Sequence, residues 1–366
     1  MSDSKEIWTI QKMLQWSKQY FETNGMDSPQ LDAQLLLGHV LGMSKIELIM
    51  NGQRPLDANE LAEYKKLIIR RAKGREPIAY ILGQKEFWSM PLSVNPDVLI
   101  PRPDTECLVE RAIEYLEARR DHRDVPWNDV ADKSQITYEK IDDREAYYRA
   151  IEAAEALENA DEASQTSDTD EKTEDSKEMG CGVGPHFEVL DIGTGSGAIA
   201  LALAKEMGTC CHLTAVDISE PALAIARKNA ETLDLSVDFI ASDLFNNIPE
   251  KKFDLIVSNP PYVTRDEMGQ LSPEVKKEPA LALEAGSDGL AIYRRLIPEA
   301  FKRLNPAGAL MLEMGCSQQA ALEELLCKAG FKKIRMFKDY AGLPRVMVGI
   351  KCNDSFGALP RTPPKV

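Results

Sequence analysis

The chain has 366 residues, 43% of them hydrophobic and 7% aromatic, which is enough to bury an α/β core and still leave a second, smaller unit. Of its formal net charge of −15, about −12 falls between residues 121 and 178, so the rest is nearly neutral and lacks the basic field that drives binding to a nucleic-acid backbone. The seven cysteines are scattered without a CxxC spacing, no apolar run is long enough to cross a bilayer, and the N-terminus lacks a targeting signal, so we expect a cytoplasmic protein with reduced thiols and no metal site.

Helical spacing of apolar residues runs through residues 1–83. Ser44 and Asp57 each stand three residues before a glutamate, which is the spacing of a capping box at a helix N-terminus. Pro29 in a first turn and Gly42 at a helix end mark a further helix between them. We therefore expect a small helical bundle here, and we interpret the basic run at the end of its last long helix as a solvent-exposed face.

Four further segments precede or follow the main core. Alternating residues with proline punctuation predict a β-hairpin linker over residues 84–103, and a first core helix capped by Asp104 is expected over 104–120. Residues 121–186 are acidic and poor in large aliphatic side chains, so we interpret them as a partly disordered surface insertion without chemistry of its own. The final residues, 353–366, have the composition of a flexible tail.

From residue 187 to residue 352, short apolar runs alternate with helical stretches rich in Ala and Leu. Six of these runs are typical of buried strands: VLDI, LTAVDI, VDFIAS, FDLIVSN, GALMLEMG and RVMVGI. Short strand–helix units in this order predict a doubly wound α/β sheet. In such sheets ligands bind at the carboxyl ends of the strands, so the residues that follow each strand are the candidate site.

The turn after the first strand contains Asp191, Gly193, Thr194, Gly195, Ser196 and Gly197 and opens a helix. Glycines let a ligand approach the backbone of this turn, and the helix N-terminus offers N–H groups. Dinucleotide enzymes space such glycines as GxGxxG to cradle a pyrophosphate, whereas here the spacing is GxGxG with a carboxylate two residues earlier. That carboxylate would repel a pyrophosphate but suits the ammonium of a methionine moiety. Residues 193–197 are therefore candidate cofactor-binding residues.

Carboxylates also stand at the ends of the next two strands. Asp217 is placed to accept hydrogen bonds from both hydroxyls of a ribose, while Ser219 is better placed than Asp217 to cap the following helix. Asp243 can accept from an adenine amino group, and Leu244 can lie against the ring. Together with the glycine turn, these residues indicate S-adenosylmethionine as the cofactor.

The fourth strand runs directly into Asn259, Pro260, Pro261 and Tyr262. Two consecutive prolines offer no N–H and stiffen the turn, which leaves the Asn259 side chain and the Pro260 carbonyl as acceptors. Two acceptors suit an –NH₂ group with its two donors, and Tyr262 can pack on the flat face of that group. We expect all four residues to bind the substrate, Asn259, Pro260 and Tyr262 to be catalytic, and Asn259 also to border the cofactor.

At these residues the chain resembles the bacterial release factor glutamine methyltransferases of the HemK/PrmC type. The resemblance implies a class I methyltransferase fold, Rossmann-like with a seven-stranded sheet, and a five-helix substrate-docking domain. It further implies S-adenosylmethionine as methyl donor and methylation of the glutamine in the Gly-Gly-Gln motif of class I peptide chain release factors. Besides the glycine turn and residues 259–262, called the tetrapeptide below, the resemblance rests on residues 76–80, 86–88, 99–106, 286–290 and 339–342.

Three other functions remain open at this point. The tetrapeptide is shared with N6-adenine and N4-cytosine methyltransferases, but these would need a basic groove for nucleic acid, which the charge distribution does not supply. Relatives that methylate a ribosomal-protein glutamine are similar as well, although they usually lack an intact RPDTE-like run such as residues 102–106. A cofactor-binding scaffold without turnover would have no use for the tetrapeptide. We therefore expect release factors as partners and no direct binding to nucleic acid or membrane.

Overall fold

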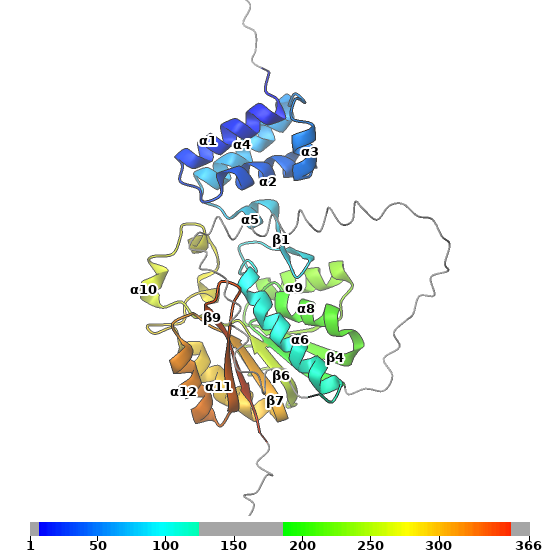
Figure 1. Cartoon of the computed structure of the whole chain (residues 1–366), viewed down its shortest axis with the longest axis vertical. Coiled ribbons are helices and arrows are strands. Elements are labelled where there is room, and N and C mark those ends of the chain that lie inside the picture. Colours follow the sequence, from blue (N-terminus) through cyan, green and yellow to red (C-terminus); the bar gives the residue numbers. More distant parts are fainter. Residues whose placement is uncertain (1–6, 124–185, 353–366) are drawn as a thin grey trace, which may run out of the picture.

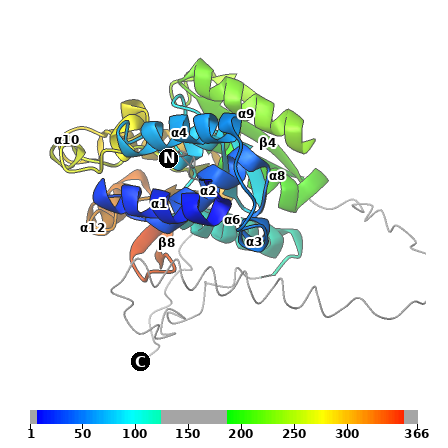
Figure 2. The same cartoon turned by 90° about the horizontal axis from the view of Figure 1, so that it is seen from above.

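The computed structural model describes residues 7–123 and 186–352. The expectations for the interior of the acidic insertion and for the C-terminal tail concern residues outside these ranges. Figure 1 shows an N-terminal helical unit beside a larger sheet-containing unit, and Figure 2 shows from above that the helical unit lies over the larger one.

The N-terminal unit is built from five helices within residues 7–83: α1 (Ile10–Thr23), α2 (Pro29–Leu41), α3 (Lys45–Met50), α4 (Ala58–Ala72) and α5 (Ile78–Leu82). The predicted capping boxes are confirmed, because Ser44 caps α3 with Glu47 and Asp57 caps α4 with Glu60. Gly42 ends α2 in the left-handed region, as its place in the sequence indicated. The helices share an apolar core of their own, so the unit packs largely against itself.

The described part of the larger unit contains a seven-stranded sheet in the order β5-β4-β3-β6-β7-β9-β8. Its strands are β3 (Phe187–Ile192), β4 (Cys211–Asp217), β5 (Asp238–Ala241), β6 (Phe253–Ser258), β7 (Leu304–Glu313), β8 (Lys332–Lys338) and β9 (Pro344–Ile350). The first five are parallel, and β9 runs antiparallel to both of its neighbours. This confirms the predicted doubly wound sheet, whose strand order reverses between β3 and β6.

Helices cover both faces of the sheet, which is why its central strands are apolar on both sides. One face carries α6 (Glu106–Arg120), α8 (Ala198–Met207) and α9 (Glu220–Leu233), and the other carries α11 (Ala291–Arg303) and α12 (Gln319–Ala329). Along β3 the side chains alternate accordingly: Val189 packs in the first layer and Leu190 in the second. Among the described helices, none has the length and apolarity that a membrane span requires.

Two elements join the helical unit to the sheet. A short hairpin, β1 (Gln84–Phe87) with β2 (Met90–Ser93), follows α5 directly. The second is a loop over residues 263–285, which contains α10 (Arg265–Met268). Arg71 of α4, only 6% exposed, bonds to Asp32 of its own unit at 2.6 Å and to Glu274 of this loop at 2.8 Å. A buried arginine that shares two carboxylates fixes the two units in one arrangement.

Two sequence expectations need correction. Asp104 does not cap α6, because it lies inside a 3₁₀ turn, η1 (Pro103–Thr105), and its carboxylate pairs with Arg345 at 3.0 Å. The hairpin is also shorter than the predicted linker, since its strands end at Ser93. Strand β8 was not among the six predicted runs. It is an edge strand in which four of seven residues are charged and exposed, so it lacks the continuous apolar run of a buried strand.

The two flanks of the insertion lie close together at the end of the sheet opposite the carboxyl ends of the parallel strands. The guanidinium of Arg119, in the last turn of α6, is 5.6 Å from the centre of the Phe187 ring at the start of β3. Replacing residues 124–183 by a short Gly/Ser linker should therefore leave the activity expected from the sequence within a few-fold of the wild-type rate. A purified variant with native circular dichroism but no activity would contradict this expectation.

Candidate active site

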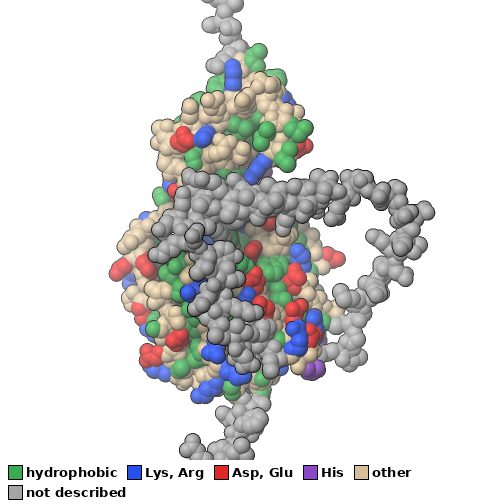
Figure 3. Space-filling model, viewed as in Figure 1, with side chains coloured by type: hydrophobic (Ala, Val, Ile, Leu, Met, Phe, Trp, Pro, Cys, Tyr) green, Lys and Arg blue, Asp and Glu red, His purple; other side chains and the backbone are tan. Residues whose placement is uncertain are grey.

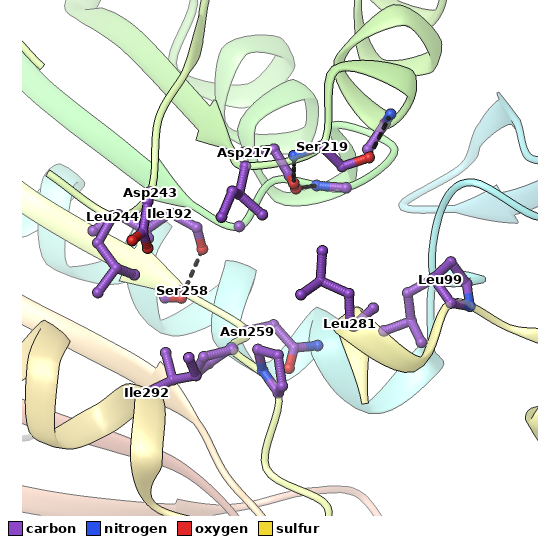
Figure 4. A pocket seen from close by; sticks show the side chains of 18 of the residues that line it. Leu99, Ile192, Asp217, Ser219, Asp243, Leu244, Ser258, Asn259, Leu281 and Ile292 are labelled. Atoms are coloured by element: carbon purple, nitrogen blue, oxygen red, sulfur yellow. Dashed lines mark hydrogen bonds between the residues drawn. The ribbon is translucent and has the colours of Figure 1, made fainter. Parts of the chain in front are cut away.

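A pocket opens at the carboxyl ends of β3, β4, β5 and β6, where the strand-end residues of the sequence analysis converge (Figure 4). Its wall also includes residues from the segment after β2 and from the loop 263–285. Among its lining residues are Leu99, Gly193, Gly195, Asp217, Ile218, Asp243, Leu244, Asn259, Pro260, Pro261, Leu281 and Arg295. The pocket therefore combines a glycine turn, the carboxylates of Asp97, Asp217 and Asp243, an apolar wall and the amide of Asn259.

Two of the three glycines in the turn face this pocket. Gly193 and Gly195 have φ values of 74° and 56°, a region that other residues adopt only with strain. A Cβ atom built on either glycine would meet no atom within 4 Å, so the space beside the turn is open to a ligand. Gly197 has a different role: a Cβ there would come within 3.0 Å of the Leu201 side chain, because α8 packs tightly at its first turn.

Asp191 lies beneath the glycine turn and does not line the pocket. Its side chain is fully buried, and the Thr194 hydroxyl donates to Oδ2 at 2.6 Å. Burial raises the pKa of this carboxyl to about 7, against the lowering effect of that hydrogen bond. The predicted role of this carboxylate toward a methionine ammonium stays a prediction, and Asp191 is not one of the residues that line the pocket. Asp191 instead holds the turn in shape through Thr194, whose side chain is buried with it.

Asp217 ends β4 and faces the pocket with a carboxylate that the backbone already orients. Its Oδ2 accepts from the Gly195 N–H at 2.9 Å and its Oδ1 from the Ser219 N–H at 2.9 Å. Burial raises its pKa, while these backbone hydrogen bonds lower it. Ser219 caps α9, as predicted. Each carboxylate oxygen retains a second lone pair, so the group can still accept from a diol in the pocket.

Beyond Asp217, part of the pocket wall is apolar. Ile218, 55% exposed, and Leu244 both line it. Leu244 has a φ of 53°, unusual for leucine, and the Ser242 hydroxyl supports this turn by donating to the Leu244 carbonyl at 2.9 Å. Asp243 is not free, because Arg295 bonds to its Oδ2 at 2.6 Å. An adenine amino group bound near Asp243 would therefore share the Asp243 carboxylate with Arg295.

Asn259 follows β6 and has its side-chain amide held at one end. Its Nδ2 donates to the Thr105 hydroxyl oxygen at 3.2 Å, and no described residue donates to its Oδ1. The two prolines that follow are on the pocket wall with it. The amide thus directs a donor away from the pocket and leaves an acceptor for a ligand.

Tyr262 turns away from the pocket wall. Its hydroxyl donates to Glu313 Oε1 at 3.5 Å, and its backbone carbonyl accepts from the Gln318 side chain at 3.1 Å. Burial, followed by the nearby Glu313 carboxyl, raises the pKa of the phenol above its usual range. Glu313 is the last residue of β7 and is 1% exposed. Its own pKa is raised by burial to about 7.

Four of the five side chains in the segment 102–106 each contact a different element of the structure. Arg102 pairs with the buried Glu278 in the loop 263–285, and Asp104 pairs with Arg345 of β9. Thr105 accepts from Asn259, and the Glu106 carboxylate accepts from the Trp88 N–H in the hairpin turn at 3.0 Å. The segment therefore ties together the hairpin, the loop 263–285, strand β9 and Asn259.

The structure brings most of the predicted site residues to one pocket, but not all. Gly193, Gly195, Asp217, Asp243, Leu244, Asn259, Pro260 and Pro261 line it. Thr194, Ser196, Gly197 and Tyr262 do not, because they are turned into the supporting structure around the turn and around Glu313. The sequence analysis did not predict Thr105, Arg295 or Glu313 as residues of the site or of its support. A carboxylate at the end of a fifth buried strand was the signal for Glu313.

Comparison with known proteins places the chain among methyltransferases. Residues 12–83 match the family model described as PrmC N-terminal domain, and residues 169–339 match the Methyltransferase small domain. The release factor glutamine methyltransferase of Geobacter sulfurreducens is 35% identical, covering 95% of this chain and 99% of that protein. Proteins of the same name from Rhodopirellula baltica and Haemophilus influenzae are 34% and 33% identical, each covering 93% of this chain and 95% and 97% of the relative.

Asp217→Ala should weaken the binding of S-adenosylmethionine by on the order of ten- to a hundred-fold, since it removes a charge-assisted acceptor that the backbone already orients. The loss should appear in the dissociation constant more than in the rate at saturating cofactor. Isothermal titration calorimetry measures it directly. Wild-type affinity in the variant would exclude Asp217 from the cofactor site.

Asp191→Asn should change how stability depends on pH. Because the folded-state pKa of Asp191 is about 7, above its ordinary 3.8, the folded protein binds the proton more tightly than the unfolded chain does. Ionisation of Asp191 therefore lowers the free energy of unfolding progressively from about pH 4 to about pH 7. The asparagine variant should gain stability relative to wild type across that window, as urea unfolding without cofactor would show. If the difference in the free energy of unfolding between wild type and Asp191→Asn did not depend on pH, the raised pKa of Asp191 would be refuted.

Proposed function

The chain belongs to the release factor glutamine methyltransferases, and we propose that Asn259 and Pro260 orient the glutamine side-chain amide of a Gly-Gly-Gln motif for methylation. The enzyme methylates release factor glutamine with S-adenosylmethionine as methyl donor, an activity that bears on translation termination. The observation that carries our assignment of residues is the Asn259 amide on the pocket wall, whose Nδ2 is held by Thr105 and whose Oδ1 accepts from no described residue.

The pocket residues fit S-adenosylmethionine part by part. The open space beside Gly193 and Gly195 accommodates the methionine portion, and the Asp217 carboxylate suits the ribose hydroxyls. The apolar side chains of Ile218 and Leu244 on the pocket wall suit the flat adenine ring. When bound, the cofactor supplies an electrophilic methyl group on a sulfonium, so the protein has no need to activate the methyl donor further.

The harder task is to prepare the acceptor nitrogen. An amide nitrogen is a weak nucleophile because its lone pair is delocalised into the carbonyl. We assign Asn259 Oδ1 and the Pro260 carbonyl as acceptors for the two amide hydrogens, since both groups border the pocket. Two such hydrogen bonds fix the plane of the amide and stabilise the positive charge that grows on the nitrogen. The surplus proton then leaves to water, and none of the pocket-lining residues is a histidine or cysteine that would act as a base.

We place the substrate protein at the opening of the pocket, at the carboxyl ends of the parallel strands. Class I release factors are the partner that the family implies, and the cytoplasm is where such a substrate is met. Methylation of a nucleic-acid base has less support, because acidic and basic side chains are interspersed on the face shown in Figure 3 and form no broad basic field there. Relatives that methylate ribosomal proteins share the same amide chemistry but usually lack an intact run like residues 102–106.

Asn259→Ala should lower the rate of methyl transfer by roughly a hundred- to a thousand-fold, about two to four kcal/mol, because it removes one of two oriented acceptors. Asn259→Asp keeps an acceptor and should retain more activity than Ala. The measurement is single-turnover transfer of labelled methyl from S-adenosylmethionine to a purified release factor, followed by mapping of the label.

The wild-type label should fall on the glutamine of Gly-Gly-Gln, and replacing that glutamine should abolish it. Strong transfer to DNA or RNA with none to the release factor would refute the protein substrate while leaving methylation of an amino nitrogen intact. A wild-type rate in Asn259→Ala would instead refute our assignment of the acceptor.

A further inference from the structure

The Asn259 side chain has two flip states, and only one of them suits the proposed reaction. A rotation of 180° exchanges Oδ1 and Nδ2, which differ in chemistry but hardly in shape. With Oδ1 toward the pocket, Asn259 accepts from the substrate amide. With Nδ2 toward the pocket, it opposes a donor with a donor. Something must therefore select between the two states.

Thr105 alone cannot make this selection. A hydroxyl donates one hydrogen bond and accepts others, so Thr105 can serve either face of the amide. In the structure it accepts from Asn259 Nδ2 at 3.2 Å. The direction of that hydrogen bond depends on where the hydroxyl hydrogen of Thr105 is used.

Glu313 supplies the acceptor for that hydrogen. Its carboxyl is in side-chain hydrogen-bond contact with Thr105, and it also accepts from the Tyr262 hydroxyl through Oε1. A hydroxyl that donates into this carboxyl leaves its own oxygen free to accept, which is the direction of the Asn259–Thr105 hydrogen bond. No described residue bonds to Glu313 Oε2, so a proton held there would leave Oε1 an acceptor. The remaining charges nearby are those of Arg345 and Asp104, which pair with each other.

We propose that Glu313 is a positioning residue that acts through the Thr105 hydroxyl and holds the Asn259 amide with Oδ1 toward the substrate. This proposal rests on the function assigned to Asn259 above. Neither Thr105 nor Glu313 lines the pocket, so neither is placed to contact a ligand there directly. Their role is to set the direction of a chain of hydrogen bonds that runs from β7 to the tetrapeptide.

Glu313→Gln tests the direction of this chain with little change in shape. A carboxamide can donate to Thr105 as well as accept from it, so the preference for one flip state is lost. The turnover number should fall by on the order of three- to thirty-fold as the productive state loses population. The dissociation constant for S-adenosylmethionine should not change.

Thr105→Val removes the hydroxyl but keeps the shape of the side chain, and should lower turnover by on the order of ten- to a hundred-fold because Asn259 Nδ2 loses its partner. Thr105→Ser retains a hydroxyl and should restore most of the rate. The matched control is Tyr293→Phe, which removes a buried hydroxyl that donates to the backbone carbonyl of Glu313 at 2.7 Å. That variant should lose thermal stability without losing turnover.

The Asn259→Asp background provides a readout specific to the flip. Aspartate has two equivalent oxygens, so Glu313→Gln should change the turnover of that background by less than about two-fold. An equal loss in the wild-type and Asn259→Asp backgrounds would overturn the proposal, as would wild-type turnover in both Glu313→Gln and Thr105→Val. If those two variants are fully active while Asn259→Ala is impaired, the positioning role fails and the proposed function stands. If Asn259→Ala is fully active, the proposed function itself fails.

Discussion

The hydrogen bond from the Asn259 amide to the Thr105 hydroxyl joins two segments that are 154 residues apart in the chain. One segment is the rigid proline turn after β6, and the other is the turn that opens α6. The proline turn fixes where Asn259 stands, but it does not fix which end of the amide faces the pocket. That choice is made from outside the turn, so the reaction depends on how the segment 102–106 is held against the sheet.

The packing of that segment explains the organisation of the rest of the molecule. Arg102 and Glu278 connect it to the loop 263–285, which in turn bonds to the helical unit through Glu274 and Arg71. The same loop supplies Leu281 to the pocket wall. The helical unit, the cofactor pocket and the acceptor turn are therefore one connected arrangement, held mainly by buried or half-buried ion pairs. Such pairs contribute geometry more reliably than they contribute stability.

The sequence was sufficient for the sheet and for the pocket wall, because both follow from local rules. Buried parallel strands are continuous apolar runs, and ligand-binding residues stand directly after them, which located Asp217, Asp243 and Asn259. Strand β8 was not predicted from an apolar run because it lies at the edge of the sheet and carries exposed charged side chains. Tyr262, Thr194 and Ser196 were expected in the site because they adjoin residues that are there, but the direction of a side chain in a turn is set by tertiary packing. Glu313 and Thr105 escaped for the same reason, since their partners are distant in the chain.

The most direct test of this account is a structure of the enzyme with S-adenosylhomocysteine and a release factor bound. The account predicts the glutamine side-chain nitrogen within about 3 Å of both Asn259 Oδ1 and the Pro260 carbonyl oxygen, with Asn259 Nδ2 still bonded to Thr105. A glutamine amide seated elsewhere in the pocket, or an Asn259 amide turned so that Nδ2 faces the substrate, would contradict it.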